Sequence, residues 1–445
     1  LANAFFKAGR FELALDLCDE LLANEPQNAD YEVLRAASLV KLGRYEEATR
    51  SYEQLLETRP DDAEILLRYS VALRIVGRSE DAIRASRQVL VQQPDNGEAY
   101  WNLANMKTFR FESAEVAAMR GALDNEGMAV GSRIYLLFAL GKAMADAGQF
   151  DESFRFYFDG NELAKSLGRY NPEDNAALAR RSLQVFTREF FEARTGGCAA
   201  PDPIFIVGLP RSGSTLLEQI LANHSAIDAT MELSEITAMV RSLDNPDRSG
   251  AASRYPGVVA ELGAEELTRL GEEYLKRTRC FRGERRHFID KAPHNFLHIG
   301  LIASILPNAK IIDARRNPLA SGWSIYTQHF ARGTNYTYDL QHIGLYYRDY
   351  LSLMDHWHAV LPGKILTVQY EDVVEDMERE LRRILDYCAL EFEPACLDFY
   401  KSKRAVATVS SEQVRQPIYS SALDHWKNYE RHLGPLKAAL RDTTS

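Results

Sequence analysis

The sequence predicts two folds in succession: an all-α solenoid of helical repeats, then an α/β domain with a central parallel sheet. Three observations support this prediction. Glycines recur every 34 residues in the N-terminal third. Residues 203–223 read as a buried strand, a tight loop and a helix. Beyond them, short apolar runs alternate with helical patterns, and this alternation favours a parallel sheet covered by helices on both faces.

The N-terminal third repeats itself with a fixed period. Gly9, Gly43 and Gly77 follow one another at intervals of 34 residues. Four further columns keep the same interval: Arg10, Arg44 and Arg78; Ala14, Ala48 and Ala82; Leu22, Leu56 and Leu90; Pro26, Pro60 and Pro94. This period is typical of a helix–turn–helix solenoid, and each unit resembles a tetratricopeptide repeat. A less regular continuation to roughly residue 165 predicts about five helical hairpins.

The chain divides at two changes of composition. We expect a tetratricopeptide-like array over residues 1–165, a polar linker with one helix over 166–200, and a C-terminal domain over 201–445. The linker ends in two glycines and a Pro-Asp-Pro stretch, which interrupt regular structure. Concave surfaces of such arrays bind partner proteins, so a protein partner and simple docking on the C-terminal domain both stay open.

The loop after residue 207 predicts an anion site. It carries Arg211, two glycines and three hydroxyl groups. The first N–H groups of the following helix have no partners within that helix, and its dipole adds positive charge, so a phosphate is the expected ligand. The loop resembles a Walker A motif, but Ser214 stands where a nucleoside triphosphatase needs lysine. This departure disfavours ATP hydrolysis and leaves phosphate binding intact.

Further polar residues follow predicted strands of the C-terminal domain. Lys291 ends a short strand that starts at residue 287, Arg316 follows the strand 309–314, and Tyr370 ends the strand 365–370. In open parallel sheets, ligands bind at the carboxyl ends of the strands. The sequence therefore predicts that these residues gather at one edge of the sheet.

These motifs in this order resemble the sulfotransferases. The resemblance rests on the loop 209–215, on Arg316 with Ser324 eight residues later, and on the run Tyr370-Glu371-Asp372. The chain is most similar to the branch related to tyrosylprotein sulfotransferase, and to bacterial proteins that join tetratricopeptide repeats to a sulfotransferase domain. The resemblance implies transfer of a sulfuryl group from 3′-phosphoadenosine 5′-phosphosulfate (PAPS) to a hydroxyl acceptor. PAP would be the product, and no metal would be needed.

The resemblance also assigns residues to the donor. The 5′-phosphosulfate site would comprise Arg211, Ser212, Gly213, Ser214 and Thr215. The 3′-phosphate site would comprise Arg316 and Ser324, with further nucleotide contacts from Tyr370, Ser410 and Ser411. Two positions depart from the branch: Gln328 replaces an arginine whose contact Arg332 could supply, and His425 stands in place of a lysine.

Sulfuryl transfer needs alignment, charge stabilisation and a base for the acceptor proton. Glu232 lies 21 residues after Arg211, as the base glutamate of the tyrosylprotein branch does. Lys291 resembles the lysine that stabilises charge on the leaving bridging oxygen, a task that Arg211 would share. His294 is the rival base, because other sulfotransferases use histidine. The choice between Glu232 and His294 stays open.

Composition narrows the class of protein. A net charge of −10 argues against general binding of nucleic acid. The five scattered cysteines form no CxxC pair, which disfavours a zinc site or disulfide framework and favours a reducing, cytoplasmic compartment. No apolar run approaches the roughly 18 residues of a membrane span. The chain starts at Leu1 within a predicted helix, so we expect that an N-terminal segment is missing.

The sequence leaves two alternatives to a sulfotransferase. A P-loop nucleotide kinase would share the loop, although the lysine and a clear Walker B strand are missing. A scaffold with a catalytically silent C-terminal domain would share the repeats, but it would have no chemical need for Arg211, Glu232, Lys291, Arg316 and Ser324 together. Peptide tyrosine, carbohydrate and small-molecule hydroxyls are all possible acceptors, and the repeats tilt the balance mildly towards a polypeptide.

Overall fold

The computed structural model describes residues 1–244, 253–330, 334–402, 404–408, 410–418 and 423–441. Contacts between Cα atoms divide the chain into two compact units. The first, the repeat unit, comprises Leu1–Ala164 and the distant segment Lys401–Gln416. The second, the α/β unit, comprises Lys165–Tyr400 and Pro417–Ser445. No helix among the described residues is long and apolar enough to cross a membrane.

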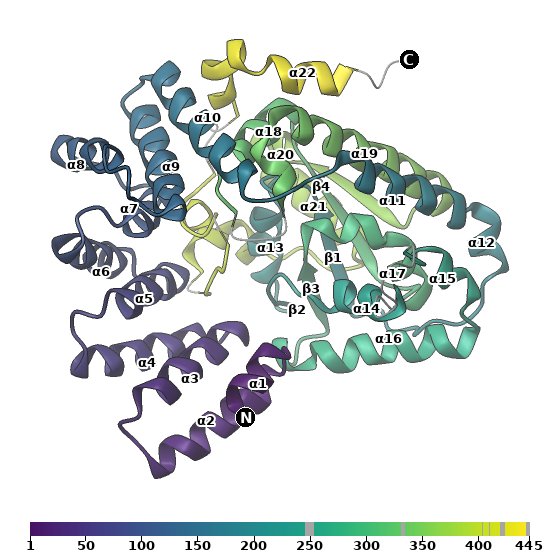
Figure 1. The fold of residues 1–445 in the computed structure, drawn as a ribbon. Helices are drawn as coiled ribbons and strands as arrows, with labels where there is room; N and C mark the ends of the chain where they lie inside the picture. Colours follow the sequence, from purple (N-terminus) through teal and green to yellow (C-terminus); the bar gives the residue numbers. More distant parts are fainter. Residues whose placement is uncertain (245–252, 331–333, 403, 409, 419–422, 442–445) are drawn as a thin grey trace. The chain divides into compact units, whose positions relative to one another are not determined.

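The repeat unit is a series of helices joined by tight turns (Figure 1). Residues 2–166, all of them described, form α1 (Ala2–Lys7), α2 (Phe11–Asn24), α3 (Ala29–Lys41), α4 (Tyr45–Thr58), α5 (Ala63–Val76), α6 (Ser79–Gln92), α7 (Gly97–Asn105), α8 (Ser113–Leu123), α9 (Val130–Asp146) and α10 (Phe150–Ser166). The prediction of a helical array is confirmed.

The repeated residues have visible structural tasks in this unit. Gly43 and Gly77 turn the chain between two helices with φ of 74° and 87°, a conformation that favours glycine. Ala48 and Ala82 are fully buried, because a small side chain lets neighbouring helices approach closely. The residues that recur every 34 positions are therefore those that form the turns and the close contacts between helices.

A parallel sheet forms the centre of the α/β unit. Among the described residues its strands are β1 (Pro203–Gly208), β2 (Ile227–Ala229), β3 (His287–Lys291), β4 (Lys310–Arg315) and β5 (Ile365–Gln369), in the spatial order β2-β3-β1-β4-β5. All the pairings between neighbouring strands are parallel. Every residue of the central strand β1 is buried, as expected for a strand with neighbours on both sides and helices on both faces.

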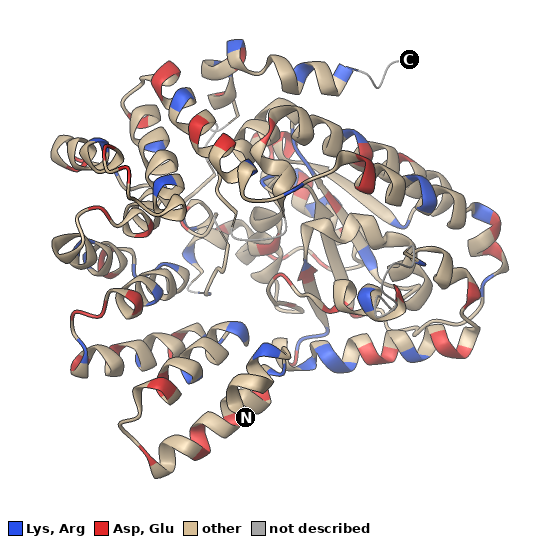
Figure 2. Cartoon of the chain, in the orientation of Figure 1, with Lys and Arg blue, Asp and Glu red and all other residues tan. Residues whose placement is uncertain are grey.

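Helices connect and cover these strands (Figure 1). They are α11 (Pro172–Val185), α12 (Arg188–Ala193), α13 (Ser214–Ala222), α14 (Glu235–Asp244), α15 (Gly257–Glu261), α16 (Ala264–Thr278), α17 (Ile299–Ile305), α18 (Pro318–Tyr326), α19 (Leu340–Val360), α20 (Tyr370–Glu375), α21 (Met377–Tyr387) and α22 (Gly434–Arg441). Figure 2 shows basic and acidic residues interspersed along α16. Leu267, Leu270 and Tyr274 of the same helix are buried, so its apolar stripe faces the core.

The stretch 166–200, expected as a linker, is packed into the α/β unit. Its helix α11 lies against α19. Phe186 follows α11, is fully buried, and has its ring centroid 5.6 Å from that of Trp357 in α19. A Cβ atom added to Gly300 would lie 2.5 Å from the Phe186 ring. These contacts make the stretch part of the hydrophobic core.

A buried acid lies in β3, the strand next to the central strand β1. Asp290 of β3 is fully buried and accepts a hydrogen bond of 2.8 Å from the Tyr274 hydroxyl. Burial raises the pKa of Asp290 to about 8, with smaller contributions from Glu235 and Glu218, while the Tyr274 bond and Lys291 act in the opposite direction. The acid precedes Lys291, which ends the strand.

The contact between Gly300 and Phe186 yields a stability prediction. Gly300→Ala should destabilise the protein by about 1–3 kcal/mol, because the new methyl group overpacks the ring. Gly257→Ala is the matched control, since a Cβ atom at that helical position meets no atom within 4 Å. Denaturant unfolding of both variants gives the comparison. Equal stability of the two would show that Phe186 does not pack against α17.

The buried acid yields a pH prediction. A carboxyl group with a raised pKa in the folded state stabilises that state fully below its unfolded pKa of roughly 3.9. This contribution declines above that pH and is lost as the pH passes through about 8. Asp290→Asn should therefore flatten the fall of the unfolding free energy between pH 5 and pH 8.5, measured in urea. The exposed Asp355→Asn should keep the wild-type slope.

Candidate functional site

Each of the five strands in the described part of the chain is followed by a polar segment at the same edge of the sheet, because parallel strands end together. The segments are the loop after β1, Glu232 shortly after β2, Lys291 at the end of β3, Arg316 directly after β4, and Tyr370 directly after β5. The register supports this placement, because Gly208 pairs with Ala314 near the ends of β1 and β4. This edge is the one that the sequence predicted for a ligand.

The loop after β1 has an unusual backbone. Gly208, Arg211 and Gly213 all have positive φ, of 138°, 67° and 97°. A Cβ atom on Gly208 would lie 2.3 Å from the carbonyl oxygen of Ala314, so a side chain there would push β1 away from β4. The loop delivers the chain to the N-terminus of α13, where Gly213 is the cap residue and no side chain caps the helix. Such an end binds anions through backbone N–H groups and the helix dipole.

The hydroxyl-bearing residues of this loop are all buried. Ser212 is 3% exposed, and within the described part of the chain its buried Oγ has no hydrogen-bond partner. Buried polar atoms are normally paired, so an atom of this kind at an anion-binding loop fits a missing oxygen ligand. Ser214 and Thr215 are also buried and start α13.

The predicted 3′-phosphate residues adjoin this loop. Arg211 donates from Nε to Ser324 Oγ at 2.9 Å, and Arg316 donates from Nη1 to the Arg211 carbonyl oxygen at 3.4 Å. The Arg316 guanidinium lies 4.7 Å from the centroid of the Tyr370 ring, a cation–π distance. A Cβ atom on Gly213 would lie 2.6 Å from Tyr370 Cδ2. Three segments far apart in sequence thus meet around two guanidinium groups.

Residues of α19 and α20 hold the turn after β4. The Tyr347 hydroxyl donates to the Arg316 carbonyl oxygen at 3.0 Å, and the Asn317 N–H donates to Glu371 Oε1 at 2.9 Å. The Asn317 side chain caps α18 by accepting the N–H groups of Leu319 and Ala320. The sequence prediction missed Tyr347, because a tyrosine at helical spacing also fits a purely apolar face.

Lys291 and Glu232 form an ion pair at the ends of β3 and β2. The Lys291 side chain is 1% exposed and donates from Nζ to Glu232 Oε1, while the glutamate side chain is 56% exposed. A buried ammonium group needs such a partner, because burial removes its hydration. The pair places a cation and a carboxylate together, and the carboxylate faces solvent.

His294 lies close to this pair. Its Nδ1 is 3.0 Å from the Tyr346 hydroxyl, and its ring packs edge to face against Tyr336. Burial lowers the pKa of His294, and the charge of Glu232 counteracts this effect. His298, by contrast, is held against the Tyr255 hydroxyl at 3.1 Å, and burial lowers its pKa to about 4. Both candidate bases, Glu232 and His294, therefore lie within electrostatic reach of each other.

The other residues expected near the nucleotide have contacts of their own. Ser410 and Ser411 belong to the repeat unit, where Ser411 is fully buried and accepts a hydrogen bond from Arg74. Their role in nucleotide binding stays a prediction. Gln328 is 2% exposed, His425 packs against Tyr429, and Arg332 lies outside the described residues.

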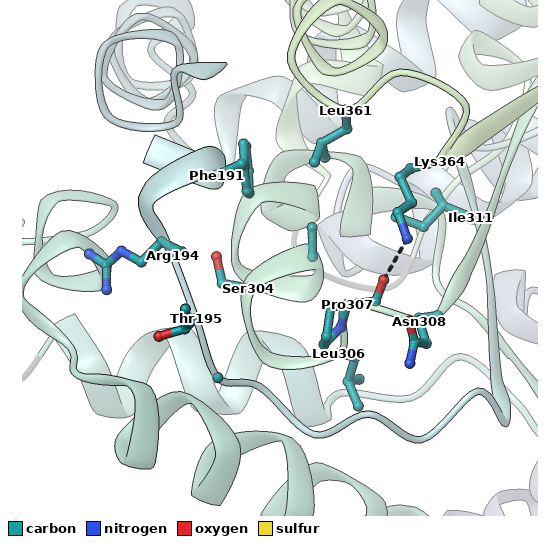
Figure 3. A pocket seen from close by; sticks show the side chains of 13 residues that line it. Phe191, Arg194, Thr195, Ser304, Leu306, Pro307, Asn308, Ile311, Leu361 and Lys364 are labelled. Atoms are coloured by element: carbon teal, nitrogen blue, oxygen red, sulfur yellow. Dashed lines mark hydrogen bonds between the residues drawn. The ribbon is translucent and has the colours of Figure 1, made fainter. Parts of the chain in front are cut away.

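A separate cavity of about 260 Å³ opens beside the amino ends of β4 and β5 (Figure 3). Phe191 and Arg194 line it from the α12 region, and Lys364 lines it just before β5. The Lys364 Nζ donates to the Pro307 carbonyl oxygen at 2.9 Å, as the dashed line shows. None of the predicted site residues lines this cavity, so it is distinct from the edge where the polar segments meet.

Comparison with known proteins agrees with the motifs. The model of the sulfotransferase family matches residues 203–394, and that of the Psidin N-terminal TPR repeats region matches residues 4–120. An uncharacterized protein of Aquifex aeolicus is 32% identical over 343 residues, which make up 76% of this chain. The chain spans only 45% of that relative's length.

Two further similarities have lower sequence identity. Protein-tyrosine sulfotransferase 1 of Danio rerio is 26% identical over 244 residues, covering 50% of this chain and 65% of that protein. The sulfotransferase domain from the Synechococcus PCC 7002 olefin synthase matches 53% of this chain and 89% of its own, with a TM-score of 0.39 and 22% identity. By the family models that match it, the chain contains a sulfotransferase domain over residues 203–394 and a tetratricopeptide repeat region within residues 4–120.

Proposed function

We propose that this protein transfers a sulfuryl group from PAPS to a hydroxyl acceptor. The observation that carries the proposal is the contact between two anion-binding features. One is the loop that ends at α13, and the other is the pair Arg316 and Ser324 next to it, joined by the 2.9 Å bond between Arg211 and Ser324. PAPS presents a 5′-phosphosulfate and a 3′-phosphate, so it needs two neighbouring anion sites.

The residues present fit this donor. The unpartnered Ser212 Oγ and the backbone at Gly213, Ser214 and Thr215 would hold the phosphosulfate. The Arg316 guanidinium can match two phosphate oxygens at once, and Ser324 offers a hydroxyl beside it. A side chain at position 213 would clash with the Tyr370 ring. Glycine at this position therefore lets the ring lie beside the loop, where the nucleotide would bind.

The Lys291–Glu232 pair would supply the transfer step with a base and with a positive charge near the leaving oxygen. The donor supplies an activated sulfuryl group, whose bond to the phosphate oxygen breaks as its bond to the acceptor oxygen forms. Glu232 accepts the proton that the acceptor hydroxyl loses, and its exposed side chain lies where an incoming acceptor can reach it. Lys291 and Arg211 stabilise the negative charge that develops on the leaving phosphate oxygen. PAP leaves with that oxygen.

A protein tyrosine is the acceptor that we favour. One relative, that of Danio rerio, is named for protein-tyrosine sulfation. The exposed position of Glu232 also suits a large acceptor better than an enclosed cavity would, because a peptide can approach from solvent. Carbohydrate and small-molecule hydroxyls are the competing acceptor classes, and we expect the reaction to take place in the cytoplasm.

The donor proposal predicts a nucleotide preference. Calorimetry should show that wild type binds PAP more tightly than ATP or ADP, and that Arg211→Ala weakens PAP binding about 10- to 100-fold through lost charge-assisted hydrogen bonds. Arg379→Ala, whose arginine is 57% exposed outside the site, is the control and should bind normally. A preference for ATP would favour a kinase, and no nucleotide binding at all would favour a silent scaffold.

The base assignment predicts a split between binding and turnover. Glu232→Gln should lower transfer from radiolabelled PAPS to a tyrosine peptide about 10²- to 10⁴-fold while PAP affinity in calorimetry is kept, because the amide cannot accept the proton. His294→Gln should cost much less. The reverse order of the two losses would make His294 the base, and transfer by wild type to p-nitrophenol but not to the peptide would reject the peptide acceptor.

A further inference from the structure

The segment Lys401–Gln416 packs within the repeat unit, although its flanking residues belong to the α/β unit. We call its residues 404–408 and 410–415 the docked segment. More than 300 positions of sequence separate it from its partners, which lie at the end of α5, at the start of α6 and just after α7. The docked segment therefore binds the repeats from a distant part of the sequence, and it does not belong to any of the helical repeats.

The docked segment satisfies the C-terminal end of α5. The Val406 N–H donates to the Ile75 carbonyl oxygen at 3.0 Å, and Arg415 Nη2 donates to the same oxygen at 2.9 Å. The last carbonyl groups of a helix have no partners within it, and a cation is favourable at its negative end. Gly77 makes room, since a Cβ atom there would lie 2.9 Å from the Arg415 guanidinium carbon.

Arg74 of α5 reaches into the same segment. Its Nη1 donates to the Thr408 carbonyl oxygen at 3.2 Å and to Ser411 Oγ at 3.0 Å. Ser411 is fully buried by this contact. Burial lowers the pKa of Arg74, and the charge of Glu412 counteracts the effect. A buried guanidinium group is tolerated because this acidic neighbour and the two acceptors compensate for its lost hydration.

Glu412 completes the contact from the other side. It is 6% exposed, and its two carboxylate oxygens are both occupied. Ser79 Oγ, at the first residue of α6, donates to Oε1 at 2.8 Å, and Thr108 Oγ1 donates to Oε2 at 3.2 Å. A carboxylate at the start of α6 also meets the positive end of that helix. We call Arg74, Ser79 and Thr108 the carboxylate pocket.

We propose that the carboxylate pocket is a peptide-recognition site of the repeats and that the docked segment is its built-in ligand. The chemistry of the site selects a turn-forming peptide in which a glutamate follows a serine, as Glu412 follows Ser411 just before the short 3-10 helix Gln413–Arg415. An external acidic peptide would then bind this pocket only by displacing the chain's own residues. The proposal concerns the repeat unit alone and does not depend on sulfuryl transfer.

Hydrogen exchange on the full-length protein tests the intramolecular part. Arg74→Ala should speed amide exchange in the docked segment at least tenfold, while exchange in α2 to α4 is unchanged. The matched control is Arg68→Ala on the same helix, whose exposed pair with Glu64 lies outside the pocket. Slow exchange of the docked segment in Arg74→Ala would overturn the proposal.

A peptide supplied in trans tests recognition itself. A fluorescent peptide with the sequence of residues 404–416 should bind full-length Glu412→Ala, whose own ligand is weakened, at least tenfold more tightly than wild type. The same peptide with glutamine at the position of Glu412 should not bind. This comparison changes the peptide and not the protein. It therefore tests recognition of the glutamate even if Arg74→Ala unfolds the repeats. Equal binding of both peptides, or none by either, would sink the proposal.

Discussion

The left-handed backbone between β1 and α13 is the constraint on which the proposed site depends. Positive φ at Gly208, Arg211 and Gly213 turns the chain sharply enough to bring the start of α13 to the end of the central strand. Only the absence of a side chain at Gly208 lets β1 and β4 stay paired there. Arg211 adopts this conformation without being glycine, and strain of this kind is tolerated where surrounding contacts impose it. The contacts with Ser324 and Arg316 do so here.

Around that turn the α/β unit is organised by buried polar contacts. Tyr350 of α19 donates to Asp313 of β4, a fully buried acid that Arg315 also contacts at 2.8 Å. On the other side of β1, Asp290 and Lys291 bury two further ionisable groups at the end of β3. Burying an ionisable group without a partner destabilises the folded state. The hydroxyl groups of Tyr350 and Tyr274 provide partners for Asp313 and Asp290. The core of this unit thus supports the same sheet edge that carries the polar segments.

The repeat unit shows how a solenoid can be occupied by its own chain. Its helices leave unsatisfied carbonyl groups at the end of α5 and a positive end at the start of α6. The docked segment supplies a guanidinium group to the first and a carboxylate to the second. Repeats of this kind commonly bind other proteins, but here a segment of the same chain contacts the end of α5 and the start of α6.

The sequence by itself determined the repeats, the parallel sheet and the five polar segments, because these depend on local periodicity and on the rule that parallel strands end together. It also predicted strands before Arg211, Lys291, Arg316 and Tyr370, but it did not predict the short strand β2 that precedes Glu232. Only the tertiary structure decided the contact of Arg211 with Ser324, the packing of Phe186 into the core, and the docking of Glu412 on the repeats. Each of these joins residues more than 100 positions apart, where no local pattern specifies the partner.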